Sequence, residues 1–146
     1  MPDETPVPPH GDWLGTPCVR LTRHGLVAHC VVDRPEAKNA MTASMSFAVR
    51  YAIDRVNGDA TLTGLILTGT DEVFIPGGDL GRVAGDDWGG PGLLGMDTVP
   101  FDAIRYSPKP VVSAINGIAQ GGGLLMAIMS DVAVASERAT FRAPEL

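Results

Sequence analysis

The stretch Gly64-Leu65-Ile66-Leu67-Thr68-Gly69 indicates a strand inside a parallel sheet. Its apolar residues are continuous instead of alternating, and a glycine stands at each end. Strands of parallel sheets are covered on both faces, so both faces carry apolar side chains. Two later runs have the same character, Val111-Val112-Ser113-Ala114-Ile115 and Val132-Ala133-Val134-Ala135. We expect both runs to be buried strands of the same sheet.

The segments around this strand predict an α/β fold. Residues 19–22 and 26–32 are β-rich runs on either side of Gly25, which predicts two antiparallel strands. Thr42 can cap a helix that ends at Asn57-Gly58. The apolar positions of that helix have helical spacing and are Met45, Ala48, Val49, Ala52, Ile53 and Val56. Further helices are predicted over 97–106 and 121–129, so strands and helices alternate with short connections.

Length and composition indicate one folded domain. The chain has 146 residues, of which 45% are hydrophobic, and its net charge is −6. Residues 1–15 are rich in proline, so we expect a flexible arm followed by a core domain over 16–146. The negative charge argues against nucleic-acid binding. No apolar stretch reaches the roughly 18 residues of a membrane span, and no signal peptide is seen, so we expect a cytoplasmic protein.

Two glycine clusters are candidates for a ligand site. Each follows a predicted strand and precedes a predicted helix, and they are Phe74-Ile75-Pro76-Gly77-Gly78-Asp79-Leu80 and Asn116-Gly117-Ile118-Ala119-Gln120-Gly121-Gly122-Gly123. Neither has the pattern of a phosphate loop or of a dinucleotide fingerprint. One interpretation is an oxyanion hole, in which one backbone N–H from each cluster stabilises a carbonyl oxygen that gains charge. The other is that the glycines only form tight turns.

Four motifs in register resemble the enoyl-CoA hydratase/isomerase (crotonase) superfamily. They are Arg34-Pro35-Glu36-Ala37-Lys38-Asn39-Ala40-Met41, Phe74-Ile75-Pro76-Gly77-Gly78-Asp79-Leu80, Lys109 to Gly117 with Gly121 to Gly123, and Asp131 to Glu145. The resemblance extends from about Val19 to the last residue. It implies a spiral of β-β-α units with a parallel sheet flanked by helices. It also implies a coenzyme A thioester as substrate, with no tightly bound cofactor.

The resemblance assigns roles to individual residues. By motif position, the amides of Gly78 and Gly122 would hold the oxygen of a thioester enolate. Ala40 and the segment Gly77 to Gly81, which includes Asp79 and Leu80, would line the CoA and acyl channel, with the loop 85–95 near the acyl tail. Pro76 replaces the small residue usual in its motif, so the aim of the Gly78 amide is less certain from sequence.

Two positions decide between the reactions of this family. The hydratases of this family use two glutamates. In this chain Leu125 occupies the first of these positions, which the resemblance places beside the substrate, and Glu145 occupies the second. One carboxylate can move a proton between two carbons, whereas adding water normally needs two groups. The pattern therefore favours double-bond isomerisation with Glu145 as the single acid/base. The alternatives are an enoyl-CoA hydratase (lyase) and a non-catalytic acyl-CoA-binding homologue, and Glu145 read alone resembles an ordinary surface carboxylate.

Other polar residues have structural interpretations. Asp79 is expected to be a helix N-cap beside the first glycine cluster, and Asp131 to cap or pair at the start of a strand. Met126 and Met129 are interpreted first as flexible core filler and, as the alternative, as residues that border the acyl pocket. Two cysteines and two histidines lie on the first strand pair without metal-ligand spacing, so no metal is expected.

The sequence is shorter than the family pattern. It stops at Leu146, one residue beyond Glu145, whereas family members continue through a largely helical C-terminal part. The family usually assembles as trimers or as dimers of trimers, so a homotrimer or hexamer is expected. Either the protein is naturally short or this sequence is only part of it; if the chain ends here, we expect apolar sheet and helix faces to lack partners.

Overall fold

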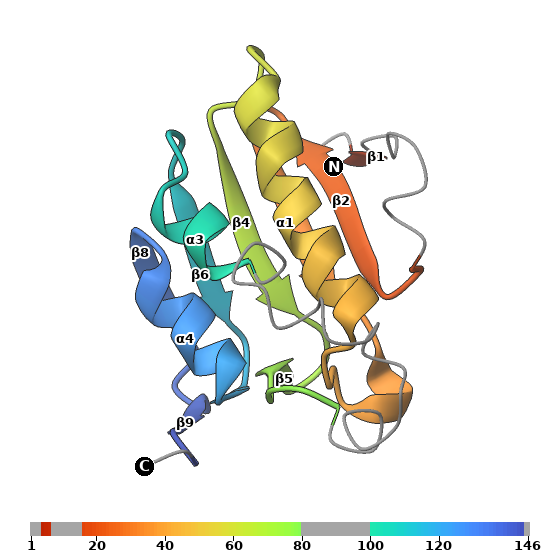
Figure 1. The fold of residues 1–146 in the computed structure, drawn as a ribbon, viewed down its shortest axis with the longest axis vertical. Helices are drawn as coiled ribbons and strands as arrows, with labels where there is room; N and C mark the ends of the chain where they lie inside the picture. The colour runs from red at the N-terminus through yellow and green to blue at the C-terminus, as the bar shows by residue number, and fades with distance from the viewer. Residues whose placement is uncertain (1–3, 7–15, 80–99, 145–146) are drawn as a thin grey trace, which may run out of the picture.

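The computed structural model describes residues 4–6, 16–79 and 100–144. In these residues the strands form two sheets (Figure 1). The larger sheet has the order β1 (Glu4–Pro6), β2 (Val19–His24), β3 (Val27–Val32), β4 (Gly64–Gly69), β6 (Val111–Ile115) and β8 (Val132–Ala135). The smaller sheet has the order β5 (Val73–Ile75), β7 (Ile118–Gln120) and β9 (Thr140–Arg142). The helices are α1 (Ala43–Gly58), α3 (Phe101–Arg105) and α4 (Gly122–Met129), with a 3-10 turn, η2 (Pro35–Ala37).

The chain alternates between the two sheets. Strands β4, β6 and β8 of the larger sheet are each followed by a short strand of the smaller one, namely β5, β7 and β9. Pairing is antiparallel from β1 to β3 and parallel from β3 to β8, and the smaller sheet is parallel throughout. The prediction of an α/β fold with a parallel sheet, helices and repeated β-β-α units is confirmed.

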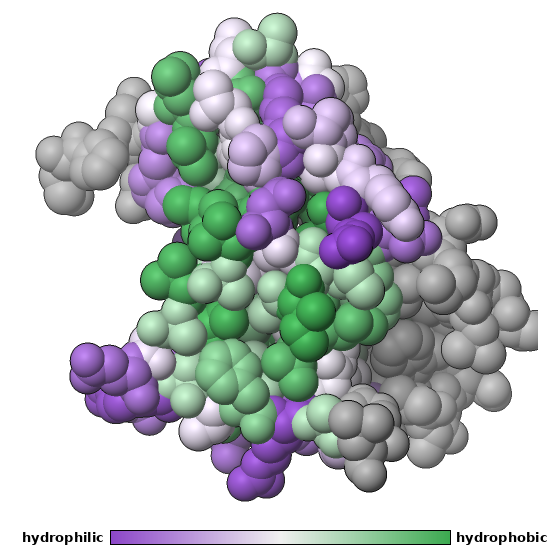
Figure 2. Space-filling model, turned by 90° about the vertical axis from the view of Figure 1, so that its left-hand side faces the viewer, coloured by the Kyte–Doolittle hydropathy of each residue, from purple (hydrophilic) through white to green (hydrophobic). Residues whose placement is uncertain are grey.

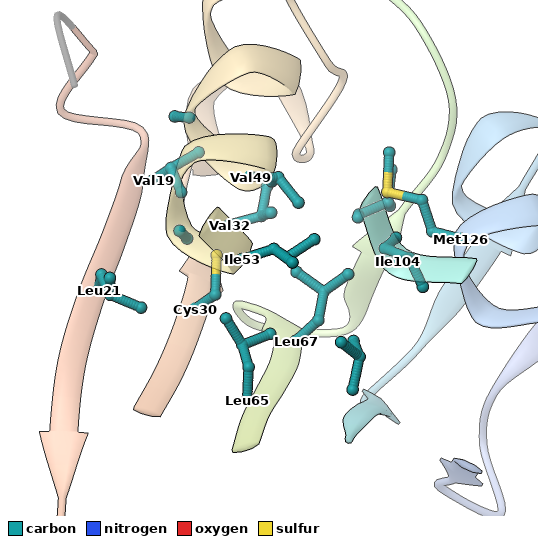
Figure 3. Packing of buried hydrophobic residues seen from close by; sticks show 14 of the residues in the cluster. Val19, Leu21, Cys30, Val32, Val49, Ile53, Leu65, Leu67, Ile104 and Met126 are labelled. Atoms are coloured by element: carbon teal, nitrogen blue, oxygen red, sulfur yellow. The ribbon is translucent and has the colours of Figure 1, made fainter. Parts of the chain in front are cut away.

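Helix α1 covers the centre of the larger sheet. The Thr42 hydroxyl accepts a hydrogen bond from the Met45 N–H at 3.3 Å, so the predicted N-cap is confirmed. All six apolar residues predicted from the helical spacing are buried. Figure 3 shows Val49 and Ile53 of this helix directed toward Cys30, Leu65 and Leu67 of the sheet. Burying a side chain of this size contributes roughly 1.5–3 kcal/mol, so this interface anchors the fold.

Strand β8 differs from the prediction of a buried strand. It forms where expected and pairs in parallel with β6, but all four of its residues are exposed. Val132 and Val134 are 52% and 60% exposed, and Ile128 of α4 is 64% exposed. Figure 2 shows apolar side chains gathered on the side of the molecule where α4 and β8 lie. The strand is last in the sheet order, so within the described residues it has a neighbour on one edge only.

Other differences concern short elements. Three residues of the predicted flexible arm, Glu4–Pro6, form β1 on the edge of the sheet beside β2. Proline is tolerated there, because an edge strand need not use every N–H. The helix predicted over 97–106 is observed at Phe101–Arg105, and residues 97–99 lie outside the described part. The described helices include none that is both long and apolar enough to cross a bilayer.

Candidate active site

The two glycine clusters meet at one small cavity. Its volume is about 100 Å³, and Gly77 and Gly78 line it from one side, Gly122 and Gly123 from the other. The remaining lining residues described are Met41, Ser46, Ile75, Pro100, Phe101 and Met126. The cavity lies beyond the carboxyl ends of β5 and β7, which belong to the smaller sheet. Sequence reasoning had taken the preceding strands to be those of the larger sheet.

The first glycine loop is held by a short parallel bridge to Met41. The Met41 N–H donates to the Gly77 carbonyl at 2.9 Å, and the Asp79 N–H donates to the Met41 carbonyl at 2.9 Å. The residue between these two bonds, Gly78, therefore directs its own N–H and C=O away from Met41. Gly77 has a φ of +109°, which L side chains rarely adopt, so glycine is required for this turn.

The second glycine loop ends in the first turn of α4. The first hydrogen bond of this helix runs from the Leu125 N–H to the Gly121 carbonyl at 3.0 Å. The N–H groups of Gly122 and Gly123 precede that bond and have no partner inside the helix. A Cβ on Gly123 would lie 1.9 Å from the Ile75 carbonyl oxygen, so only glycine lets α4 approach β5 this closely. A Cβ on Gly122 would have room, since its nearest neighbour is the Phe101 ring at 3.7 Å.

These loops offer two N–H donors at one cavity. Within the described residues, neither the Gly78 nor the Gly122 N–H donates to a protein acceptor. The walls around them are largely apolar, with Ile75, Phe101 and Met126 among them. Donors in such surroundings stabilise a developing negative charge more strongly than they would in water. The arrangement can therefore bind a carbonyl oxygen that becomes an oxyanion.

Two asparagines fix the corner that leads from β4 into β5. The Asn39 side chain is 1% exposed, and its amide donates to the Val73 carbonyl at 2.9 Å. Asn116 accepts from the Gly69 N–H at 3.1 Å and donates to the Asp71 carbonyl at 2.9 Å. These bonds satisfy backbone groups where the chain leaves the larger sheet. They thereby fix the direction of β5 and, with it, the position of the first glycine loop that follows this strand.

An ion pair lies directly beside this loop. The Arg34 Nη1 atom is 2.8 Å from Asp79 Oδ2 and 2.8 Å from the Ala40 carbonyl oxygen. The Arg34 and Asp79 side chains are only 12% and 19% exposed. Sequence reasoning assigned Asp79 to a helix N-cap, but the residues after it lie outside the described part, so that role is untested. The interaction with Arg34 was missed, because 45 residues separate the partners.

The structure places the other predicted site residues as follows. Gly77, Gly78 and Gly122 line the cavity. Ala40 adjoins it through Met41, and its carbonyl is held by Arg34. Leu125 is half-buried one residue before Met126, which lines the cavity in agreement with the alternative interpretation, but Leu125 is not among the described lining residues. Leu80, Gly81, Glu145 and the loop 85–95 lie outside the described residues.

Several lining residues were not found from the sequence. Phe101 and Pro100 come from the start of α3, and Ser46 comes from α1. The apolar periodicity of these helices indicated which residues face the core. It gave no indication that their ends converge on the glycine loops, because that depends on how the helices pack together.

Two further candidates have structural roles. The Asp131 carboxylate accepts a hydrogen bond from the Val111 N–H at 2.8 Å, which confirms the predicted pairing at the start of a strand. Cys30 is buried in the core, and burial raises the pKa of its thiol to about 12. A thiol with this pKa is protonated at neutral pH and is a poor nucleophile. Neither residue takes part in the candidate site.

A larger cavity lies at the opposite end of the smaller sheet. Its volume is about 570 Å³, and its walls include Lys38, Asp71, Glu72, Asn116 and Arg138. Arg138 pairs with Glu72 at 3.4 Å, and both side chains are more than four-fifths exposed. The cavity is wide and lies at the surface, and its walls combine these charged side chains with apolar ones such as Val73 and Ile118.

Comparison with known proteins agrees with this geometry. Residues 22–146 match the family model for enoyl-CoA hydratase/isomerase. The match covers more than half of the chain, so this protein belongs to the enoyl-CoA hydratase/isomerase family. The family acts on coenzyme A thioesters, as the resemblance implied.

Individual relatives span a longer chain. Carnitinyl-CoA dehydratase of Salmonella enteritidis is 38% identical over 133 residues, which are 87% of this chain and 49% of the relative. The structure of an enoyl-CoA hydratase/isomerase from Xanthobacter autotrophicus has a TM-score of 0.77 at 28% identity and covers 88% of this chain and 49% of its own. An enoyl-CoA hydratase from Bacillus anthracis has a TM-score of 0.77 at 26% identity and covers 88% and 51%. The chain thus spans about half the length of the relatives it matches.

Proposed function

We propose that this protein binds the thioester of an acyl-CoA in the small cavity and catalyses migration of a double bond in an enoyl-CoA. The thioester oxygen would accept hydrogen bonds from the N–H groups of Gly78 and Gly122. The observation that carries the proposal is that two glycine loops, from different strands, present N–H donors to one largely apolar cavity. Ala40 and the segment Gly77 to Gly81 would guide the CoA and acyl parts of the substrate to this point.

The proposed reaction is a proton transfer between two carbons. With a 3-enoyl-CoA, Glu145 would take a proton from C2, and the electrons of that C–H bond would delocalise onto the thioester oxygen and C4. The same carboxyl group would return the proton to C4, leaving the double bond between C2 and C3. Two preorganised N–H donors stabilise the intermediate oxyanion, and removing one such donor typically costs 10²- to 10³-fold in rate.

The residue at position 125 supports isomerisation over hydration. A leucine cannot hold or transfer a proton, so only Glu145 would remain as a general acid/base among the two family positions. Leu125 is not among the described lining residues, but its neighbour Met126 makes the wall of the cavity apolar at this end of α4. An apolar wall excludes the water that hydration would require.

A second candidate is hydration or dehydration of an acyl-CoA. The observation that favours it is the 38% identity to carnitinyl-CoA dehydratase, whose name denotes an enzyme of the lyase class. In that case a water molecule would replace C4 as the partner of Glu145, and a further group would have to orient it. A non-catalytic acyl-CoA-binding protein is the third outcome, in which binding persists without turnover.

The absorbance of the conjugated enoyl thioester separates these outcomes. We expect it to rise when the protein meets a 3-enoyl-CoA and to stay constant with a 2-enoyl-CoA. A fall with the 2-enoyl-CoA would establish hydration and contradict the argument from Leu125. No change in absorbance with either substrate, together with measurable acyl-CoA binding, would establish the non-catalytic alternative.

Variants at the two family positions test the roles of these residues. Glu145→Gln should abolish the rise while keeping acyl-CoA binding, and Glu137→Gln, which alters an exposed glutamate of the same region, should not. Leu125→Glu should introduce hydration, whereas Leu124→Glu, one position away on α4, should not. Turnover that survives in Glu145→Gln would contradict the single-carboxylate mechanism.

A further inference from the structure

From its contacts we infer that Arg34 is a positioning residue that fixes the direction of the Gly78 N–H. The inference rests on the proposed function, because it assigns Arg34 a part in building the oxyanion hole. Arg34 does not line the small cavity; it acts from behind the loop that does. Its guanidinium joins the segment 40–41 to the segment 77–79.

The contacts of Arg34 place it across both sides of the bridge that carries Gly78. One nitrogen, Nη1, lies 2.8 Å from the Ala40 carbonyl oxygen and 2.8 Å from Asp79 Oδ2. Ala40 immediately precedes Met41, and Asp79 immediately follows Gly78. Two N–H bonds of a single planar nitrogen thus hold the two strands of the bridge at a fixed separation and angle.

The glycine loop needs such a tether. Neither Gly77 nor Gly78 has a side chain that could pack and limit its backbone, and glycine has the widest conformational freedom of any residue. The two backbone hydrogen bonds to Met41 fix the loop on one side only. A displacement of about 1 Å in a positioned group can cost around 100-fold in rate, so the loop has to be held closely.

Burial distinguishes this ion pair from the other ion pairs within the described residues. The Arg34 and Asp79 side chains are 12% and 19% exposed, whereas Arg20 and Asp33 form a 3.0 Å pair at 53% and 32% exposure. Exposed pairs are screened by water and contribute little. A shielded, charge-assisted contact is stronger and more directional. The second carboxylate near Arg34, that of Glu36, lies farther away at 3.6 Å and is 68% exposed.

The backbone around Arg34 fixes the start of its side chain. The Arg34 N–H donates to Asn39 Oδ1 at 2.8 Å, and Asn39 is itself buried and bonded to the Val73 carbonyl. Arg34 is therefore bonded to the same corner from which β5 begins. Its guanidinium links that corner to Asp79, which lies at the far end of the glycine loop.

A conservative substitution separates positioning from simple stabilisation. Arg34→Lys keeps the positive charge but lacks the planar group with fixed N–H directions, and Arg34→Gln also removes the charge. Asp79→Asn weakens the same contact from the carboxylate side. It replaces the Arg34 variants in the test if those variants do not fold. Arg20→Gln breaks the exposed pair and is the matched control.

The readout is the carbonyl stretching band of bound 2-butenoyl-CoA carrying ¹³C at the thioester carbon. Hydrogen bonds from an oxyanion hole weaken the C=O bond and lower its frequency. We expect Arg34→Lys and Asp79→Asn to lose at least half of the shift seen in the parent protein, while the Kd of the ligand changes less than about threefold. Turnover should fall about 10- to 100-fold with KM nearly constant, and Arg20→Gln should match the parent in all respects.

The outcomes distinguish two failures. A parent protein that binds the ligand with no shift in the carbonyl band overturns the proposed oxyanion hole, and the role of Arg34 with it. A parent that shows the shift, with folded Arg34→Lys and Asp79→Asn variants that keep it in full, overturns only the positioning role.

Discussion

The two ends of the smaller sheet carry cavities that differ in size and in the side chains that line them. The end at which β5, β7 and β9 begin opens into about 570 Å³ lined by charged and amide side chains. The end at which β5 and β7 finish holds about 100 Å³ lined by glycines and apolar side chains. The larger space has more room for a ligand, but its Arg138 pairs with Glu72 and its Asn116 bonds to the backbone. The smaller one leaves backbone donors available, so the chemistry of the walls and not the volume identifies the candidate site.

The largest effect is expected from removing one of these donors. Gly122→Pro deletes the N–H at the first position of α4, where proline is well tolerated by the helix. We expect acyl-CoA turnover to fall about 10²- to 10³-fold, measured as steady-state kcat/KM. Gly122→Ala keeps the N–H, and its Cβ has room, so it should stay within about threefold of the parent. Equal losses in both variants would argue that side-chain bulk, and not the N–H, matters at this end.

The next effect concerns the close approach of α4 to β5. Gly123→Ala would place a Cβ 1.9 Å from the Ile75 carbonyl oxygen, so either the helix or the strand has to move. We expect a loss of about 1–3 kcal/mol in the free energy of unfolding, measured by urea denaturation. Ligand affinity should fall as well, because the second glycine loop moves with the helix. A stable variant with unchanged affinity would show that the small cavity does not depend on this packing.

At the larger cavity, a variant of Asn116 should affect stability more than ligand binding. Asn116→Ala removes the hydrogen bonds to Gly69 and Asp71 and leaves their backbone groups unpaired. We expect a loss of about 1–2 kcal/mol in unfolding free energy. The Kd for an acyl-CoA, measured by titration calorimetry on the folded variant, should rise less than about tenfold, because Asn39 still holds the corner that leads into β5. A large loss of affinity at unchanged stability would make the larger cavity a ligand site.

The smallest effect is expected from the exposed charges of that end. Arg138→Gln breaks a pair whose partners are both more than four-fifths exposed. The expected change in unfolding free energy is within about 0.5 kcal/mol, and acyl-CoA binding should not change. A clear weakening of binding would mean that the larger cavity receives part of the CoA.

The longer elements of the fold were predictable from local patterns. The spacing of apolar residues from Met45 to Val56 identified α1, and the continuous apolar run at 64–69 identified a strand of a parallel sheet. Both patterns reflect burial, and both elements are long enough for the spacing of their apolar residues to be recognised. The burial of β8 was predicted wrongly. An apolar run shows that a strand favours burial, but it does not show whether the described residues include a segment that covers the strand.

The smaller sheet and its consequences were not predictable in this way. Strands β5, β7 and β9 have three residues each, too few for a period, and they form because backbone groups from distant segments pair. The glycine clusters could be recognised as a candidate site, and Gly78 and Gly122, which the motifs single out, both line one cavity, while their role as oxyanion donors stays a prediction. The Arg34–Asp79 contact required the folded structure, since nothing near either residue in sequence indicates its partner.

The central claim is that the thioester oxygen of an acyl-CoA lies between the N–H groups of Gly78 and Gly122. The most direct measurement is a ¹H–¹⁵N NMR titration of the protein with butanoyl-CoA, a saturated thioester that cannot undergo double-bond migration. The account predicts that the amide protons of Gly78 and Gly122 move downfield together and saturate with one Kd, while those of Gly117 and Ile118 at the larger cavity stay in place. Shifts confined to Gly117 and Ile118, with Gly78 and Gly122 unchanged, would contradict it.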